Sequence, residues 1–292
     1  MNQKKKIGGD GLYKFFIYFV LIALAVSIVI PVGWVFMASI KENSEFYGNP
    51  WALPLGFYWQ NFVDAWNAAN MGEYMINSVI VTALALGILL VTALPASYAL
   101  ARFQFKGSKF LNAAFMGGLF INVNYIVVPI FLMLRDGNAW TLQVFGEGLL
   151  LNNLFVLAIV YAATALPFTI YLLSGYFVTL PHDFEEAAYI DGAGFFRTFF
   201  TVILPVSRPC LATAGVMQFL LCWNEFQFAL TLTTGLKSRT MPIALYYFTS
   251  QFASDYGAMF AATALIALPS VLIYCLLQEQ VVAGLTSGAV KG

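Results

Sequence analysis

Long apolar runs are the feature that most constrains how this chain can fold. A helix needs about 20 mostly apolar residues to cross a bilayer, and the 292-residue sequence offers six such candidates. They cover about 15–39, 75–100, 110–134, 149–178, 210–234 and 258–277. Only 10% of the residues are charged and 61% are hydrophobic, whereas a soluble domain carries about 25% charged residues. The sequence therefore predicts an all-α, polytopic membrane bundle of six transmembrane helices in a single membrane domain, residues 1–292.

The distribution of Lys and Arg predicts the orientation of the bundle, because cytoplasmic connections carry an excess of both. Six spans place both termini on the same side, which also holds the connections after the second and fourth spans. That side carries Lys4, Lys5, Lys6, Lys14, Arg102, Lys106, Lys109, Arg197, Arg208 and Lys291. The opposite side carries Lys41, Arg135, Lys237 and Arg239. We therefore expect both termini, and the connection 181–209, in the cytoplasm.

Several classes of function are disfavoured by composition. The formal net charge is zero, so no basic surface predicts nucleic-acid binding. The three cysteines lie far apart in or beside apolar runs, and His182 is the one histidine, which predicts no metal site. The segment GLKSRT at Gly235 has the wrong order for a phosphate-binding loop. With no Ser, His and acid set either, we expect neither an enzyme nor a cofactor site in this chain.

The connection 181–209 contains two short helical patterns. Asp183 is placed to cap a first helix over about 184–191, with Glu186 three residues later as in a capping box, and Gly192 is placed to end it. A second, amphipathic pattern has apolar residues at helical spacing, while Arg197, Thr198 and Thr201 are expected to point elsewhere. Its apolar members are Phe195, Phe196, Phe199, Phe200 and Ile203. A solvated connector between spans and a docking element for a cytoplasmic partner both fit this pattern.

A specific spacing within this connection resembles a known family. Glu186-Ala187-Ala188, then Gly192, then Val202-Ile203-Leu204-Pro205 is similar to the EAA motif of permease subunits of binding-protein-dependent ABC importers, with Val202 where isoleucine is usual. The segments INSVIVT, WNEFQFALTLT, SRTMPIAL and the ending GAVKG resemble the carbohydrate importers of that family. The nearest in kind is the smaller permease of the maltose importer. The resemblance covers about 39–292.

The resemblance implies a type I ABC importer transmembrane fold, with a permease core over about 72–280 and a cytoplasmic coupling loop over about 181–209. In that family a short coupling helix docks on a separate ATPase subunit, which binds the ATP. The matching positions here are Glu185, Glu186, Ala187, Ala188, Asp191, Gly192 and Ala193. The C-terminal tail is a second candidate contact with the ATPase, through Gly288, Ala289, Val290, Lys291 and Gly292.

The implied function is ATP-driven import of a sugar or oligosaccharide across a bacterial plasma (inner) membrane. The implied partners are a second permease subunit, an ATPase subunit dimer, an extracytoplasmic sugar-binding protein and the lipid bilayer. A permease for a non-sugar solute remains an alternative. So does a secondary transporter, for which we would expect inverted repeats and several intramembrane acids.

Polar residues inside the predicted spans are candidates for the substrate pathway. Glu225 is the one acid well inside a span, and a charge there costs about 2.5–3.5 kcal/mol on insertion scales, so it should face the bundle interior. The other candidates are Asn122, Asn124, Tyr125, Trp223 and Asn224. Hydrogen bonding between helices is the alternative role for all of them.

Overall fold

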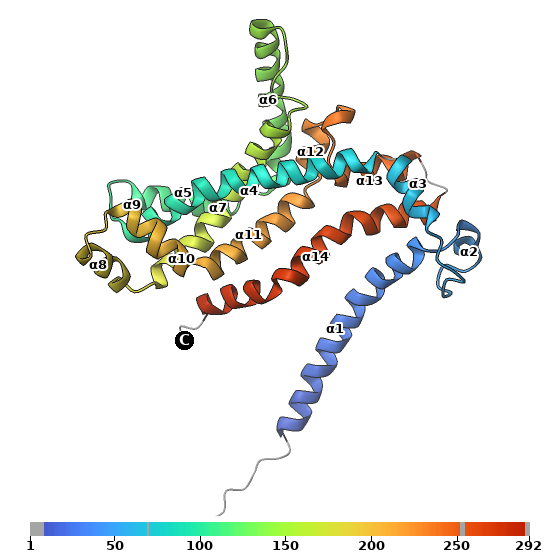
Figure 1. Cartoon of the computed structure of the whole chain (residues 1–292), viewed down its shortest axis with the longest axis horizontal. Helices are drawn as coiled ribbons and strands as arrows, with labels where there is room; N and C mark the ends of the chain where they lie inside the picture. Colours follow the sequence, from blue (N-terminus) through green and yellow to red (C-terminus); the bar gives the residue numbers. More distant parts are fainter. Residues whose placement is uncertain (1–8, 69, 252–254, 290–292) are drawn as a thin grey trace, which may run out of the picture. The chain divides into compact units, whose positions relative to one another are not determined.

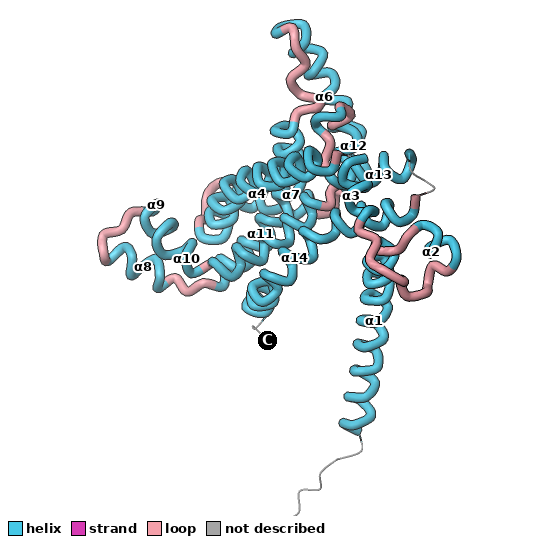
Figure 2. Tube along the Cα trace, turned by 45° about the vertical axis from the view of Figure 1, so that its right-hand side comes forward, coloured by secondary structure: helices cyan, strands magenta, loops and turns pink. Residues whose placement is uncertain are grey.

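The computed structural model describes residues 9–68, 70–251 and 255–289, which form helices joined by loops with no strand among them (Figures 1 and 2). The predicted all-α class is confirmed. The helices are α1 (Gly9–Ser39), α2 (Asn43–Gly48), α3 (Gln60–Ala68), α4 (Met71–Arg102), α5 (Ser108–Gly118), α6 (Val123–Phe145), α7 (Leu154–Thr179), α8 (Asp183–Ile190), α9 (Phe195–Thr198), a π-helical turn η1 (Phe199–Ile203), α10 (Leu204–Val206), α11 (Arg208–Trp223), α12 (Gln227–Leu232), a 3₁₀ turn η2 (Leu236–Ser238), α13 (Met241–Gln251) and α14 (Tyr256–Ala289).

Four of the described helices are long and apolar enough to cross a bilayer. They are Tyr13–Ser39 within α1, the whole of α4 and α7, and Tyr256–Glu279 within α14. Two bent pairs are further candidates: α5 with α6, bent by 103°, and Phe195–Val206 with α11, bent by 75°. The described residues therefore give a multi-pass membrane protein with four spans, or up to the predicted six if each bent pair crosses once.

The third predicted span is not the continuous helix expected over 110–134. α5 ends at Gly118, where an added Cβ would lie 2.8 Å from Cγ of Pro167 on α7, so the two backbones approach closely. α6 then starts afresh, because the Asn122 side chain caps it by accepting the N–H of Asn124 at 2.9 Å. Hydropathy averaged over a window treats both helices as one apolar run, because it contains no information about hydrogen bonds that cap a helix.

The chain divides into two compact units, which are described separately. The first comprises residues 1–69 and 247–267. Its described part contains an aromatic cluster, Trp34, Phe46, Trp51, Tyr256 and Phe260.

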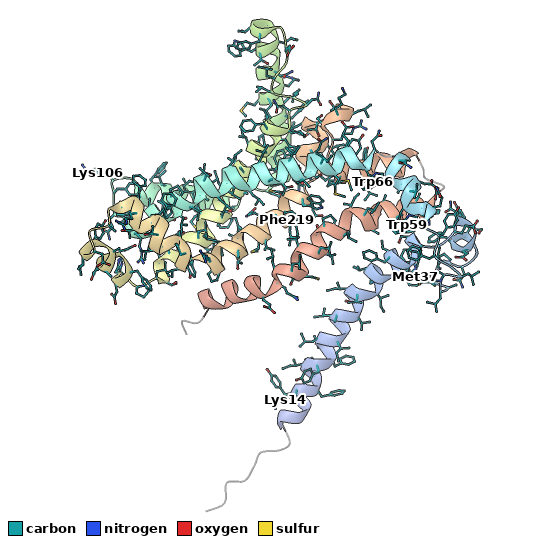
Figure 3. The ribbon with its side chains drawn as sticks, viewed as in Figure 1. Lys14, Met37, Trp59, Trp66, Lys106 and Phe219 are labelled. Atoms are coloured by element: carbon teal, nitrogen blue, oxygen red, sulfur yellow. The ribbon has the colours of Figure 1, made fainter. Side chains whose placement is uncertain are left out.

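Two buried polar side chains complete the first unit. The Lys41 ammonium is 1% exposed and donates to the carbonyls of Asn49 and Pro50 at 3.2 and 3.0 Å. Asn61 donates to the carbonyls of Ser39 and Lys41 at 2.9 and 2.7 Å. The short helix α3 carries Trp66 and follows directly after Trp59, and Figure 3 labels both residues.

The second unit comprises residues 70–246 and 268–292 and contains the loop 181–209. α4 packs along α7, and α11 packs against both (Figure 1). Leu89 of α4, Ile170 and Phe177 of α7 and Ala214 of α11 are almost fully buried in this core. These three helices thus form the frame from which the loop 181–209 and the α11–α12 break project.

Two neighbouring polar side chains, one amide and one hydroxyl, fix the other end of α4. Asn77 donates to the carbonyls of Lys237 and Arg239, both at 2.9 Å. The next residue, Ser78, accepts the N–H of Met241 at 2.8 Å. Two segments that resemble importer permeases, INSVIVT and SRTMPIAL, therefore meet in space.

The close approach of α5 and α7 gives a testable prediction. Replacing Gly118 with Ala places a methyl group 2.8 Å from the Pro167 ring, and such overpacking costs about 1–3 kcal/mol. The neighbouring Gly117 has nothing within 4 Å of an added Cβ, so Gly117→Ala is the matched control. We expect Gly118→Ala to lower the unfolding temperature in detergent and Gly117→Ala to leave it unchanged. Equal melting of both variants would contradict this packing.

Candidate functional site

The loop 181–209, called the elbow below, begins with α8. This helix starts at Asp183, and its N-cap position is His182, with no side-chain capping hydrogen bond. The prediction that Asp183 and Glu186 form a capping box is therefore wrong. Asp183, Glu185 and Glu186 instead occupy the first turn, where negative charge is stabilised by the helix dipole.

A Schellman motif ends α8 at the predicted glycine. Gly192 has φ +76°, a left-handed conformation that glycine adopts without strain. Its N–H donates to the Tyr189 carbonyl at 3.0 Å, and the N–H of Ala193 donates to the Ala188 carbonyl at 2.8 Å. These are the two reversed hydrogen bonds that define the motif. An added Cβ at Gly192 would meet nothing within 4 Å, so this turn faces open space.

The carboxylate of Glu185 anchors α8 to the end of α4. It lies 3.1 Å from Nε of Arg102, with the two side chains only 14% and 3% exposed. Tyr98 donates its hydroxyl to the same carboxylate at 2.7 Å, and Arg102 Nη2 donates to the Leu180 carbonyl at 2.7 Å. His182 lies 3.2 Å from the second carboxylate oxygen. Glu185 is thus engaged by this chain's own residues.

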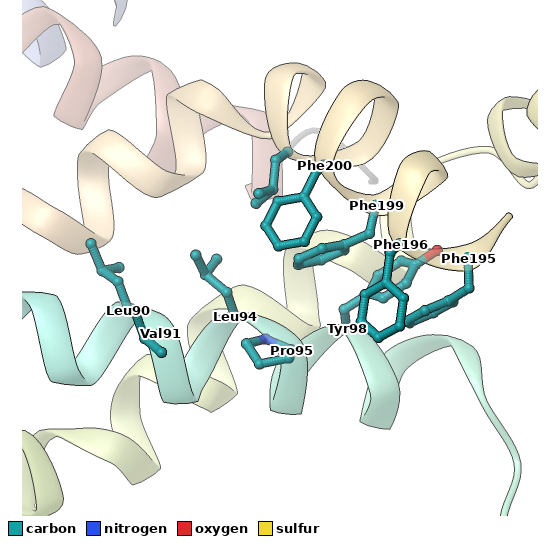
Figure 4. Close-up of a pocket in the computed structure, with 10 residues that line it drawn as sticks. Leu90, Val91, Leu94, Pro95, Tyr98, Phe195, Phe196, Phe199 and Phe200 are labelled. Atoms are coloured by element: carbon teal, nitrogen blue, oxygen red, sulfur yellow. The ribbon is translucent and has the colours of Figure 1, made fainter. Parts of the chain in front are cut away.

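The phenylalanine pattern of the elbow divides into buried and exposed members. Phe199 and Ile203 are buried, and Phe195, Phe196 and Phe200 are exposed. Thr198, expected to point away, is also buried, and the π-helical turn η1 follows directly after it. The phenylalanines line an apolar cavity of about 330 Å³ against Leu90, Val91, Leu94, Pro95 and Tyr98 of α4 (Figure 4). Such a lining offers nothing with which to recognise a polar solute.

The exposed residues of α8 and of the turn that ends it are called the α8 face below. Its members are Glu186, Ala187, Tyr189, Ile190, Asp191 and Gly192. Tyr189 is 58% and Ile190 86% exposed. Of the other predicted docking residues, Ala188 is buried and Ala193 is half-buried.

The predicted C-terminal contact is only partly described. Gly288 and Ala289 are the last residues of α14. Val290, Lys291 and Gly292 lie outside the described residues.

The predicted pathway residues fall at two helix breaks. Asn122 caps α6, and Asn124 and Tyr125 in its first turn are exposed, Tyr125 by 81%. Trp223 ends α11 and is buried against Phe219, with ring centroids 5.6 Å apart.

The fifth predicted span stops at Trp223, short of the expected Thr234, and Glu225 explains the break. Its carboxylate accepts the N–H groups of Phe228 at 2.8 Å and Ala229 at 3.1 Å, so it caps the N-terminus of α12. The preceding Asn224 donates to the Leu220 carbonyl at 2.8 Å and contacts the Ser270 hydroxyl at 3.4 Å. Glu225 thus makes local structural hydrogen bonds, and its charge is stabilised by backbone donors.

Glu225 also faces a cavity that sequence reasoning missed. The cavity has a volume of about 200 Å³ and includes Tyr161 and Thr164 of α7 and Gln218 of α11 in its lining. Of the predicted pathway residues only Glu225 lines it. Tyr161 and Gln218 carry no signal of their own in the sequence, because each is a single polar residue in an apolar run.

Comparisons with known proteins agree with this geometry. The family model for the inner membrane component of binding-protein-dependent transport systems matches residues 93–286. A diacetylchitobiose uptake system permease from Streptomyces coelicolor is 37% identical over 273 residues, which cover 93% of this chain and 87% of the relative. A trehalose/maltose transport system permease from Thermococcus litoralis is 31% identical, with 93% and 94% covered.

The fold is similar to that of a solved transporter. A chain of the bacterial ABC transporter involved in import of the acidic polysaccharide alginate matches with a TM-score of 0.77 at 20% identity, over 96% of this chain and 99% of that chain. The resemblance indicated by the EAA-like spacing is confirmed. This chain belongs to the family of inner membrane components of binding-protein-dependent transport systems.

Proposed function

We propose that this chain is the membrane-spanning permease subunit of an ATP-driven sugar importer, and that the α8 face docks on a separate ATPase subunit. The observation that carries the proposal is the elbow: a short helix, fixed on one side to α4 and exposed on the other, within a chain of this family. The whole of 1–292 acts as one membrane domain, with the permease core over about 72–280.

Exposure and charge on the α8 face support docking. Exposed apolar side chains that gather on one surface can mark an interaction site, and a two-turn helix is marginal by itself. The elbow carries four acidic residues and two arginines, so a basic cleft on the partner would complement it. Small residues, Ala187 and Gly192, allow the partner's backbone to approach closely.

The anchoring of α8 explains how docking would drive transport. Glu185 ties α8 to Arg102 at the end of α4, and the elbow runs on into α11. A displacement of α8 by the ATPase would therefore be transmitted to two core helices at once. This coupling is how ATP hydrolysis in the partner would switch access to the solute pathway.

The solute class follows from the relatives' functions. The similar permeases serve uptake of diacetylchitobiose and trehalose/maltose, and a third, from Bacillus subtilis, serves melibiose, raffinose and stachyose at 31% identity. Import of a non-sugar solute is the alternative within the family. A secondary transporter is the alternative outside the family. It would need several intramembrane acids, and Glu225 is already used as a helix cap.

The proposed assembly contains a second permease subunit, an ATPase dimer and an extracytoplasmic sugar-binding protein. It sits in a bacterial inner membrane with both termini of this chain in the cytoplasm. ATP binds to the partner ATPase, and this chain performs no catalysis itself. The tail 288–292 is a second contact with the ATPase.

Isolation of the native complex tests this proposal. The chain is tagged, extracted gently from its own membranes and analysed by mass spectrometry, and the complex is then reconstituted with its binding protein for sugar uptake. We expect an ATPase and a second permease to co-purify, and uptake to require ATP. Recovery of the chain alone with ATP-independent transport would favour the secondary transporter.

Docking predicts that a side chain at Gly192 disturbs the partner and leaves the fold intact. Asn tolerates the left-handed conformation, and space around Gly192 is open. We expect Gly192→Asn to keep its level in the membrane but to lower ATP-dependent uptake roughly tenfold, as at an interface hot spot. The control is Gly146→Asn, at φ +78° with equally open surroundings. Normal uptake by a stable Gly192→Asn variant would remove the docking claim.

Substitutions of the two adjacent glutamates should distinguish the anchoring of α8 to α4 from its docking on the ATPase. Glu185→Gln leaves the buried Arg102 without its counter-charge, so we expect a loss of about 1.5–3 kcal/mol in stability. Glu186→Gln changes an exposed residue and should leave the unfolding temperature unchanged while weakening co-purification of the ATPase. Thermal unfolding and pull-down on both variants provide the comparison, and reversed or identical behaviour contradicts these assignments.

A further inference from the structure

We propose that the cavity between α7, α11 and α12 binds one ring of an uncharged, hydroxyl-rich sugar, and that Glu225 disfavours anionic sugars there. This inference rests on the proposed transport function and names a contact point for the solute in this chain. The cavity is lined by Val123, Tyr161, Thr164, Ala165, Phe168, Gln218, Leu221, Cys222, Glu225 and Phe228.

Two buried polar atoms in this lining have unused hydrogen-bonding capacity, the Tyr161 hydroxyl and the Gln218 carbonyl oxygen. They belong to residues that are 3% and 1% exposed. The hydroxyl interacts with the Glu225 carboxylate, whereas the Gln218 oxygen has no hydrogen-bond partner among the described residues. Leaving such an oxygen unpaired costs about 1–3 kcal/mol. A ligand that supplies both donors and acceptors would recover this cost, and sugar hydroxyls do both.

Glu225 is held as a fixed acceptor. The N–H groups of Phe228 and Ala229 each occupy one site on its two oxygens, and a carboxylate has about four such sites. The Tyr161 hydroxyl interacts with the same carboxylate, and a ligand's hydroxyls can donate to the acceptor sites that remain. Because the backbone of α12 orients the carboxylate, no side-chain reorganisation is needed when the ligand enters.

The charge of the lining discriminates between sugars. Glu225 is the one charged residue in it, with no Lys or Arg. An acidic sugar would bring a second negative charge towards a carboxylate that no cation among the described lining residues balances, which is unfavourable in a low-dielectric site. The structurally similar transporter, by contrast, is involved in the import of the acidic polysaccharide alginate.

Size and shape limit the ligand to part of an oligosaccharide. About 200 Å³ falls below the range of roughly 300–1,000 Å³ that encloses a drug-sized ligand. Phe168 and Phe228 supply apolar ring surface against which the C–H face of a sugar can pack. A helix break at a solute site is also a general device of membrane transporters.

Cys222 provides a built-in reporter of occupancy. It lines the cavity, whereas Cys275 is exposed and lies outside the lining. In the assembled complex, alkylation of each cysteine by a small maleimide is quantified by mass spectrometry with and without diacetylchitobiose, maltose or trehalose. If Cys222 reacts too slowly without sugar, Leu221→Cys, an exposed lining position, serves as the reporter. We expect at least one of these sugars to protect the cavity thiol and not Cys275.

Tyr161→Phe tests the hydrogen bond without changing the packing. Loss of one such bond should raise the sugar concentration needed for half-protection, and the KM of uptake, roughly fivefold. Tyr171→Phe removes a hydroxyl from the same helix outside the cavity and should behave as wild type. Unchanged half-protection in a folded Tyr161→Phe variant would overturn the proposal.

An alginate disaccharide tests the charge. It should not protect the cavity thiol in the wild-type complex. Glu225→Gln should reduce the difference between neutral and anionic sugars in the concentration needed for half-protection. Equal protection by both sugars in wild type, or protection by none, contradicts the inference. If sugars protect the thiol but the complex shows no ATP-dependent uptake, only the proposed transport function is contradicted. If the complex takes up sugar but no sugar protects the thiol, only the proposed sugar cavity is contradicted.

Discussion

The ion pair between Arg102 and Glu185 is the interaction on which the arrangement of the elbow depends. The Arg102 side chain is almost completely buried, and a buried cation requires a counter-charge and hydrogen-bond acceptors. Glu185 supplies the charge, and the Leu180 carbonyl supplies an acceptor. α8 therefore cannot leave the end of α4 without exposing an uncompensated charge. This converts a two-turn helix, marginal on its own, into a fixed part of the bundle.

Polar interactions fix the chain on both sides of α11. At its start the elbow is tied to α4, and past its end Glu225 caps α12. The 16 residues of α11 span roughly 24 Å as an ideal helix, so they connect the proposed docking surface to the proposed sugar cavity through one rigid element. In the proposed importer, a movement of the elbow would shift the α11 side of the cavity relative to Tyr161 on α7.

Both helix breaks in the spans have the same physical origin. Backbone groups freed in a membrane must find partners within the protein, and a side-chain cap is the shortest way to supply them. Asn122 does this for α6 and Glu225 for α12. The carboxylate that is costly in a membrane thus satisfies donors that would also be costly unpaired, which explains why an acid is accommodated there.

The sequence by itself determined the fold class, the approximate spans, the end of α8 at Gly192 and the family, because hydropathy, glycine chemistry and the EAA-like spacing are local properties of the chain. It predicted neither the broken third and fifth spans nor the partners of individual side chains. Glu185 and Glu186 are adjacent and chemically identical, yet one is turned to Arg102 and the other is exposed. Tyr161 and Gln218 lie in different helices. Only packing brings such residues together, since it is decided by contacts between segments far apart in sequence, which no local pattern records.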